Sequence, residues 1–112
     1  MDIVFKTNKL QKECNDQKLL VKHHGPRRAG LIRRRLDDLR AAGTLEAMRS
    51  LPQARCHELK GNRAGQISVD LDHPYRLIFK PASEPLPTRP DGGLDWSKVS
   101  AITILGVEDT HE

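Results

Sequence analysis

The spacing of apolar residues changes after Leu51-Pro52, and this change restricts the chain to a fold that joins helices to a sheet. In the first half, apolar residues recur at intervals of three and four, which is typical of an amphipathic helix: Ala29, Ile32, Leu36 and Leu39. In the second half, residues 67–71 and 75–79 alternate between apolar and polar, as half-buried strands do. Residues 99–107 are almost continuously apolar, which is typical of a buried strand. The pattern predicts an α+β fold.

Two helices are expected in the first half, followed by one short helical turn. The first covers 8–24, and its start carries the capping-box pair Asn8 and Gln11. The dipeptide Gly25-Pro26 breaks the chain and begins the second helix, because proline is tolerated in a first turn. Gly43 ends that helix.

The strands are expected to form one mainly antiparallel sheet. Residues 2–6 are β-prone, 72–74 make the turn of a hairpin, and 99–107 lie near the centre of the sheet. Residues 80–98 are rich in proline and glycine, so we expect a long irregular loop that is functional or mobile. The predicted architecture is one domain over residues 1–112, with the two N-terminal helices packed on one face of the sheet.

The net charge of +4 conceals an asymmetry along the chain. Residues 1–66 carry 15 Lys and Arg against 7 Asp and Glu, whereas residues 67–112 carry 4 against 8. This polarity favours an anionic partner, such as a nucleic acid, for one part of the surface. The alternative is that the basic side chains only solvate helix faces.

Several classes of protein are disfavoured by composition. No stretch is long and apolar enough to span a membrane, and no signal peptide follows Met1, so we expect a cytoplasmic protein that does not bind membranes. Cys14 and Cys56 are too few for a disulfide framework, and we interpret them as packing thiols. No spacing of ligand residues is typical of a metal site and no glycine-rich loop is typical of phosphate binding. We therefore predict no cofactor and no metal.

Two short segments carry residues that suit RNA cleavage without a metal. This reaction needs a base for the 2′-hydroxyl proton, an acid for the departing 5′-oxygen, and cations for the charge on phosphorus. Histidine titrates near neutrality, so His57 and His111 are candidates for the base and the acid, in either order. Lys60 and Arg76 are candidates for holding the phosphate, and Asp109 for supporting His111.

Each candidate also has a structural interpretation. Arg76 alternates with apolar neighbours, so it points away from the face that they bury, either to a substrate or only to solvent. A departure from strand geometry after His57 is needed for Lys60 to face the same cleft; otherwise Lys60 begins a polar turn. Asp109 equally suits a terminal cap. The pair His23-His24 suits a helix C-terminus rather than a ligand site.

Four fragments in a fixed order carry a resemblance to a known family. They are His57-x-Leu59-Lys60-Gly61, Gly65-Gln66-x-Ser68-Val69, Tyr75-Arg76-Leu77-Ile78-Phe79 and Val107-x-Asp109-x-His111. Together they resemble the HigB group of the RelE/ParE toxin superfamily, bacterial toxins of type II toxin–antitoxin modules. The resemblance covers nearly the whole chain, including the two basic N-terminal helices.

This resemblance implies a microbial-ribonuclease-like sheet and a ribosome-dependent endoribonuclease that cleaves mRNA in the ribosomal A site. It also implies a HigA-like antitoxin with a helix-turn-helix domain, through which alone the toxin would contact operator DNA. By position, His57 and Lys60 match the family's basic pair, Arg76 its central-strand arginine, and Asp109 and His111 its C-terminal motif. RNA phosphates would then be contacted by the remaining basic residues: Arg27, Arg28, Arg33, Arg34 and Arg63.

The chain departs from the family at Thr110, where related toxins often have a tyrosine expected to stack on an mRNA base. Because such stacking contributes about 1–3 kcal/mol, either Trp96 supplies the aromatic surface or activity is reduced. Two other functions remain open. One is a non-enzymatic inhibitor of DNA gyrase of the ParE type, which has no need of the His57, Lys60 and His111 set. The other is an inactive partner that only binds an antitoxin or DNA.

Overall fold

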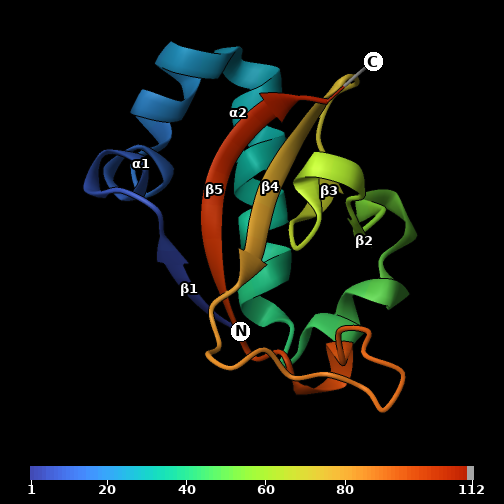
Figure 1. The fold of residues 1–112 in the computed structure, drawn as a ribbon. Coiled ribbons are helices and arrows are strands. Elements are labelled where there is room, and N and C mark those ends of the chain that lie inside the picture. Colours follow the sequence, from blue (N-terminus) through green and yellow to red (C-terminus); the bar gives the residue numbers. More distant parts are fainter. Residues whose placement is uncertain (111–112) are drawn as a thin grey trace.

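The computed structural model describes residues 1–110, which form a five-stranded sheet with helices packed against it (Figure 1). The strands are β1 (Asp2–Phe5), β2 (His57–Glu58), β3 (Ile67–Asp70), β4 (Tyr75–Pro81) and β5 (Ala101–Asp109). The α-helices are α1 (Asn8–Cys14) and α2 (Gln17–Ala41). Short 3-10 turns are η1 (Leu45–Ser50), η2 (Pro52–Ala54), η3 (Gly61–Arg63) and η4 (Trp96–Lys98). The α+β class predicted from the sequence is confirmed.

The sheet has the strand order β1-β5-β4-β3-β2. β1 pairs with β5 in parallel, and every other pair is antiparallel, as predicted. In Figure 1 the long helix α2 lies behind β4 and β5, so one face of the sheet is covered and the other is turned to the viewer. We call the second face the open face. β5 has a neighbour on both sides, as its apolar run predicts, although β4 is the middle strand.

The prediction of one continuous helix over 8–24 is wrong, because the helix is interrupted after Cys14. Thr7, one residue earlier than predicted, caps α1 by accepting a hydrogen bond from the main-chain N–H of Leu10 at 3.1 Å. Asp16 then caps α2, and its carboxylate accepts from the main-chain N–H two residues on at 3.0 Å. An aspartate at this position satisfies N–H groups that have no partner inside the helix, which favours starting a new helix there.

The predicted break at Gly25-Pro26 is present as a kink within α2. Gly25 has φ 80° and ψ 161°, a conformation that glycine adopts readily, and the following proline has no N–H to donate to the preceding turn. The kink separates the start of α2, beside α1, from the part that covers the sheet. None of the helices within residues 1–110 has the combination of length and apolar character needed to cross a bilayer.

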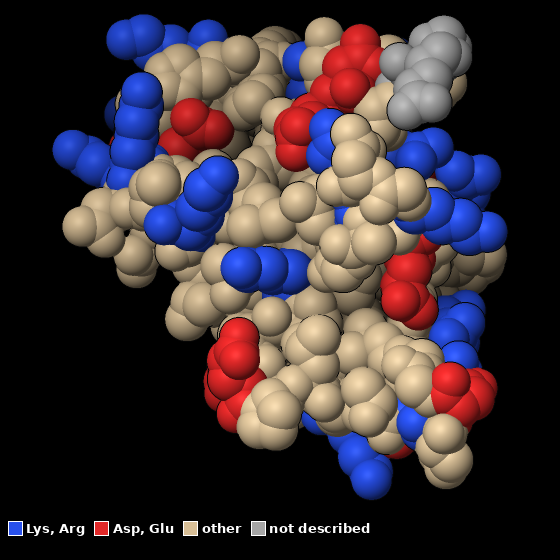
Figure 2. All heavy atoms as spheres, in the orientation of Figure 1, with Lys and Arg blue, Asp and Glu red and all other residues tan. Residues whose placement is uncertain are grey.

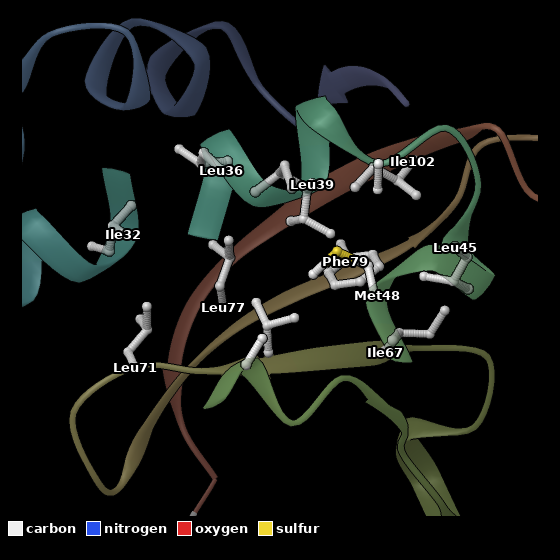
Figure 3. Close-up of a cluster of buried hydrophobic side chains, with 14 of the residues drawn as sticks. Ile32, Leu36, Leu39, Leu45, Met48, Ile67, Leu71, Leu77, Phe79 and Ile102 are labelled. Carbon is white, nitrogen blue, oxygen red and sulfur yellow. The ribbon is translucent and has the colours of Figure 1, made fainter. Parts of the chain in front are cut away.

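The core lies between α2 and the covered face of the sheet (Figure 3). Leu36 and Leu39 from α2 point toward Leu77 and Phe79 of β4, and all four are fully buried. Met48 from η1 lies against Phe79 at one end of the same layer. Burial of each such side chain contributes about 1.5–3 kcal/mol, so this layer fixes which face of β4 is turned to the helices.

The chain between β4 and η4 has no helix or long strand, as its prolines predict, and only Thr88 and Leu94 form an isolated bridge there. It is anchored at its end by Trp96, which is 5% exposed. The Trp96 ring NH donates a hydrogen bond to the Glu58 carboxylate at 3.0 Å, and the Arg49 guanidinium lies 4.0 Å from the ring centroid. Trp96 is therefore a core residue, and the alternative that it supplies an aromatic surface for RNA is wrong.

Candidate active site

Strand alternation on β4 places Arg76 on the open face. Leu77 and Phe79 point into the core, so Arg76 points the other way, as predicted. Residues directly opposite one another in neighbouring strands share a face. Arg76 pairs with Asp70 of β3. Ser68, two residues before Asp70 on β3, pairs on its other side with His57 of β2. The register thus brings His57, Asp70 and Arg76 to one face of the sheet.

The imidazole of His57 is held by two contacts. Its Nδ1 lies 2.8 Å from the carbonyl oxygen of Arg55, and its Nε2 lies 3.5 Å from Nη1 of Arg76. A carbonyl oxygen only accepts hydrogen bonds, so Nδ1 carries a hydrogen and donates it. In the neutral ring, Nε2 therefore holds the lone pair. This nitrogen faces the arginine at a distance longer than the usual 2.9–3.0 Å hydrogen bond.

One carboxylate positions two guanidinium groups beside His57. Asp70 forms ion pairs with both: one carboxylate oxygen lies 2.9 Å from Nε of Arg55 and the other lies 3.4 Å from Nε of Arg76. The Asp70 main-chain carbonyl accepts from Nε of the buried Arg35 at 2.8 Å, which ties this end of β3 to α2. Two cations share one anion, so the cluster carries a local excess of positive charge. Phosphate is a natural counterion for such a pair of arginines.

Arg55 holds a backbone conformation that non-glycine residues rarely adopt. Its φ is 45° and ψ is 51°, and it is the only residue other than glycine with positive φ within 1–110. Such conformations cost about 1–3 kcal/mol and cluster at functional sites. Here the turn aims the Arg55 carbonyl at His57 and its side chain at Asp70. The sequence gives no sign of this conformation.

A hollow of about 350 Å³ opens beside this cluster, within the size range of small-ligand sites. Its ionic wall consists of Arg55, Asp70 and Arg76. The opposite wall is formed by the turn between β3 and β4, with Leu71, His73, Pro74 and Tyr75. A second hollow, lined by Arg55, Cys56 and His57, adjoins it. A phosphate with an attached organic group fits the chemistry of these walls.

The structure brings together two of the five predicted catalytic residues, His57 and Arg76. Lys60 is exposed where the chain has left β2 and enters η3, so the predicted departure from strand geometry is present, but it does not place Lys60 beside His57 in the cluster. Asp109 pairs with Tyr75, whose side chain lies on the face opposite to that of Arg76. The register therefore places Asp109 on that opposite face. His111 lies outside the described residues.

Three of the five predicted RNA-binding arginines make contacts within the protein. Arg28 holds Asp72 at 2.9 Å and lies 3.5 Å from the centroid of a tyrosine ring; this ion pair raises the pKa of the guanidinium and lowers the pKa of the carboxyl. Arg33 donates to the carbonyl of Cys14 at 2.9 Å. Arg63 reaches Glu108 of β5 at 2.8 Å, and this hydrogen bond lowers the pKa of the Glu108 carboxyl.

The other two, Arg27 and Arg34, are exposed on α2. That helix lies behind the sheet, away from His57 (Figure 1). Figure 2 shows the open face, on which basic side chains gather over α1 and along the β2 side. The second of these basic groups is therefore on the same side of the sheet as His57, and the arginines of α2 are on the other side.

The remaining predictions concern Thr110 and the cysteines. Thr110 donates its main-chain N–H to the carbonyl of Pro74 at 3.4 Å, at the rim of the hollow. Burial raises the pKa of the Cys14 thiol to about 11 and of the Cys56 thiol to about 12, so both thiols are protonated at neutral pH and suit packing. Within residues 1–110, no group of three or more His, Cys, Asp or Glu side chains is arranged to hold a metal ion.

Comparison with protein-family models and with curated proteins finds no match to this chain. The protein is therefore described by its fold and by the chemistry of the site. It is an α+β protein with a histidine and two arginines clustered on the open face of its sheet, beside a hollow of small-ligand size.

Proposed function

We propose that this protein is an endoribonuclease that cleaves mRNA by acid–base chemistry and needs no metal for the reaction. The observation that carries this proposal is the position of His57 Nε2, 3.5 Å from Nη1 of Arg76. A nitrogen whose lone pair faces a phosphate-binding cation suits removal of a 2′-hydroxyl proton once that cation has turned to the phosphate. Arg76 suits the charge that develops on phosphorus.

The proposed step balances without a further reagent. His57 Nε2 takes the 2′-hydroxyl proton, the 2′-oxygen bonds to phosphorus, and the bond from phosphorus to the 5′-oxygen breaks. An acid gives a proton to that oxygen. The products are a 2′,3′-cyclic phosphate and a 5′-hydroxyl end. Asp70 helps to position Arg76, because its carboxylate lies 3.4 Å from Nε, and Nη1, which faces His57 Nε2, would contact the phosphate.

In the cell, we propose that the protein is the toxin of a type II toxin–antitoxin module and acts in the cytoplasm on mRNA bound to the ribosome. Support for this comes from the resemblance to HigB. Two of the residues that carry the resemblance, His57 and Arg76, lie together on the open face. A HigA-like helix-turn-helix antitoxin would neutralise it and would carry any contact with operator DNA.

The test is induction of wild type, His57→Ala and His23→Ala in bacteria, with mRNA 5′ ends mapped and growth recorded. His23 is the matched control, because its imidazole lies at the α1–α2 contact and bonds to Glu13. We expect growth arrest and new ends at codon-phased positions with wild type and His23→Ala, and neither with folded His57→Ala.

Other outcomes point to the competing functions. Growth arrest by wild type without new mRNA ends, together with blocked gyrase, would replace the proposal with gyrase inhibition. Neither arrest nor cleavage from folded protein that is free of antitoxin would identify an inactive binding partner. New ends that persist unchanged in His57→Ala would remove His57 from the site.

A further inference from the structure

The turn between β3 and β4 presents a second imidazole to the arginine cluster. His73 is exposed and lines the hollow that Arg55 and Arg76 also line. His57 lines the adjoining hollow, and Arg55 is common to both. The guanidinium pair is thus flanked by one imidazole from β2 and another from the turn. Alternation along the strands could not identify His73, because it lies in the turn.

We propose that His73 is the acid that protonates the departing 5′-oxygen. This inference rests on the proposed function, because it names the second proton-transfer group of that reaction. The attacking and departing oxygens lie on opposite sides of phosphorus in such a displacement. A phosphate held by Arg76 would therefore need a base on one side and an acid on the other, and His57 and His73 flank Arg76 in this way.

The turn that carries His73 is held on both sides of this residue. Before it, Asp72 accepts two hydrogen bonds from Arg28 of α2, at 2.9 and 3.2 Å. After it, the carbonyl of Pro74 accepts the main-chain N–H of Thr110 at 3.4 Å. The turn is closed by the N–H of Tyr75, which donates to the Asp72 carbonyl at 2.8 Å. Such support limits the motion of a catalytic group, which acid catalysis requires.

The proton movements are complementary. The His73 imidazolium gives its proton to the 5′-oxygen as the bond from phosphorus to that oxygen breaks, and it becomes neutral. His57 becomes protonated at Nε2 by the 2′-hydroxyl in the same step. Exchange with water restores both rings for the next cleavage. The proton transfers therefore need no group besides these two imidazoles.

His23 and His24 lie in a different part of the fold. Both bond to the carboxylate of Glu13, at 2.7 and 3.0 Å, at the contact between α1 and α2. His111 is the histidine that the family resemblance offers as the partner of His57. The experiment must therefore distinguish His73 from His111, and an acid from a residue that only maintains the fold.

A change of leaving group makes this distinction. Ribosome-bound mRNA is prepared with either the natural 5′-oxygen or a bridging sulfur at the cleaved bond, because a thiolate leaves without a proton. Wild type, His73→Gln, His111→Gln and His57→Gln are compared on both substrates in single-turnover reactions. Thermal unfolding of each variant reports whether it remains folded.

We expect His73→Gln to slow cleavage of the oxygen substrate by a factor of about 10²–10⁴ and to cleave the sulfur substrate at close to the wild-type rate. His57→Gln should be slow on both, because a base is needed for either leaving group. Wild-type rates for His73→Gln on oxygen, equal slowing on both substrates, or recovery by sulfur in His111→Gln instead would overturn the assignment. Wild type that cleaves neither substrate would overturn the proposed function itself.

Discussion

Two clusters in this protein combine imidazole with charged groups, and they differ in the charge that the imidazole faces. At the contact of α1 with α2, the Glu13 carboxylate receives His23 Nδ1 at 2.7 Å and His24 Nε2 at 3.0 Å. On the open face, His57 Nε2 faces Nη1 of Arg76 at 3.5 Å. The first cluster joins imidazoles to an anion, and the second joins an imidazole to a cation.

The two clusters also differ in whether their charges are balanced within the protein. Burial opposes ionisation of Glu13, but hydrogen bonds from His24 and His23 outweigh it and lower the pKa of the carboxyl. That cluster is complete within the protein. Around His57, Arg55 and Arg76 share Asp70, and Glu108, opposite Arg76 in the register, is paired with Arg63. The arginines outnumber the carboxylates, so an added anion is favourable there. Charge balance thus distinguishes the two histidine clusters: the Glu13 cluster is balanced within the protein, whereas the His57 cluster favours an added anion.

The largest expected effect comes from removing the cation that His57 faces. Arg76→Gln should lower the rate of mRNA cleavage by a factor of about 10²–10³, because developing charge on phosphorus loses its main counterion. Single-turnover cleavage of ribosome-bound mRNA measures this. Arg34→Gln is the matched control: Arg34 is exposed on α2, behind the sheet, and its variant should cleave at the wild-type rate. Equal rates for the two variants would contradict the contrast between the clusters.

A stability effect without loss of cleavage is expected at the other cluster. Glu13→Gln replaces the anion between His23 and His24, and should lower the free energy of unfolding by about 1–3 kcal/mol, since hydrogen bonds to charged groups are the stronger ones. Urea denaturation measures this. The control is Asp37→Asn, where a 62% exposed carboxylate pairs with Arg33 and a loss of about 0.5 kcal/mol or less is expected. Loss of cleavage in folded Glu13→Gln would show that this cluster also serves the reaction.

Local patterns in the sequence were sufficient to predict the open face of β4. Alternation is a property of a few neighbouring residues, so the direction of Arg76 follows from its apolar neighbours alone. Asp70 was missed, although the same pattern contains it: a hairpin that turns at 72–74 pairs residue 70 with residue 76. His57 was predicted on chemical grounds, and the pairing of β2 with β3 places it beside Arg76.

Long-range packing decides the rest, and short patterns do not contain it. The face on which Asp109 lies depends on the register between β4 and β5, which shifts at Ile78/Phe79. Trp96 is buried by Arg49 and Glu58, which are far from it in the sequence. Arg55 joins the cluster through a left-handed backbone conformation that only the folded chain imposes. The residues that make up the site were therefore harder to predict than the face of the sheet on which it lies.

The smallest expected effect is an acid dependence that identifies the Glu13 carboxylate as the source of stability. The pKa of Glu13 is lowered from its usual 4.5 in the folded protein. Its contribution is therefore fully present above pH 4.5 and is lost as the pH falls through the folded value. Wild type should be more stable than Glu13→Gln at neutral pH, and their free energies of unfolding should converge on acidification below that range. Urea denaturation at a series of pH values measures the difference. If the difference in free energy of unfolding stayed constant or widened in acid, the packing of the side chain, and not the charge shared with His23 and His24, would hold the two helices together.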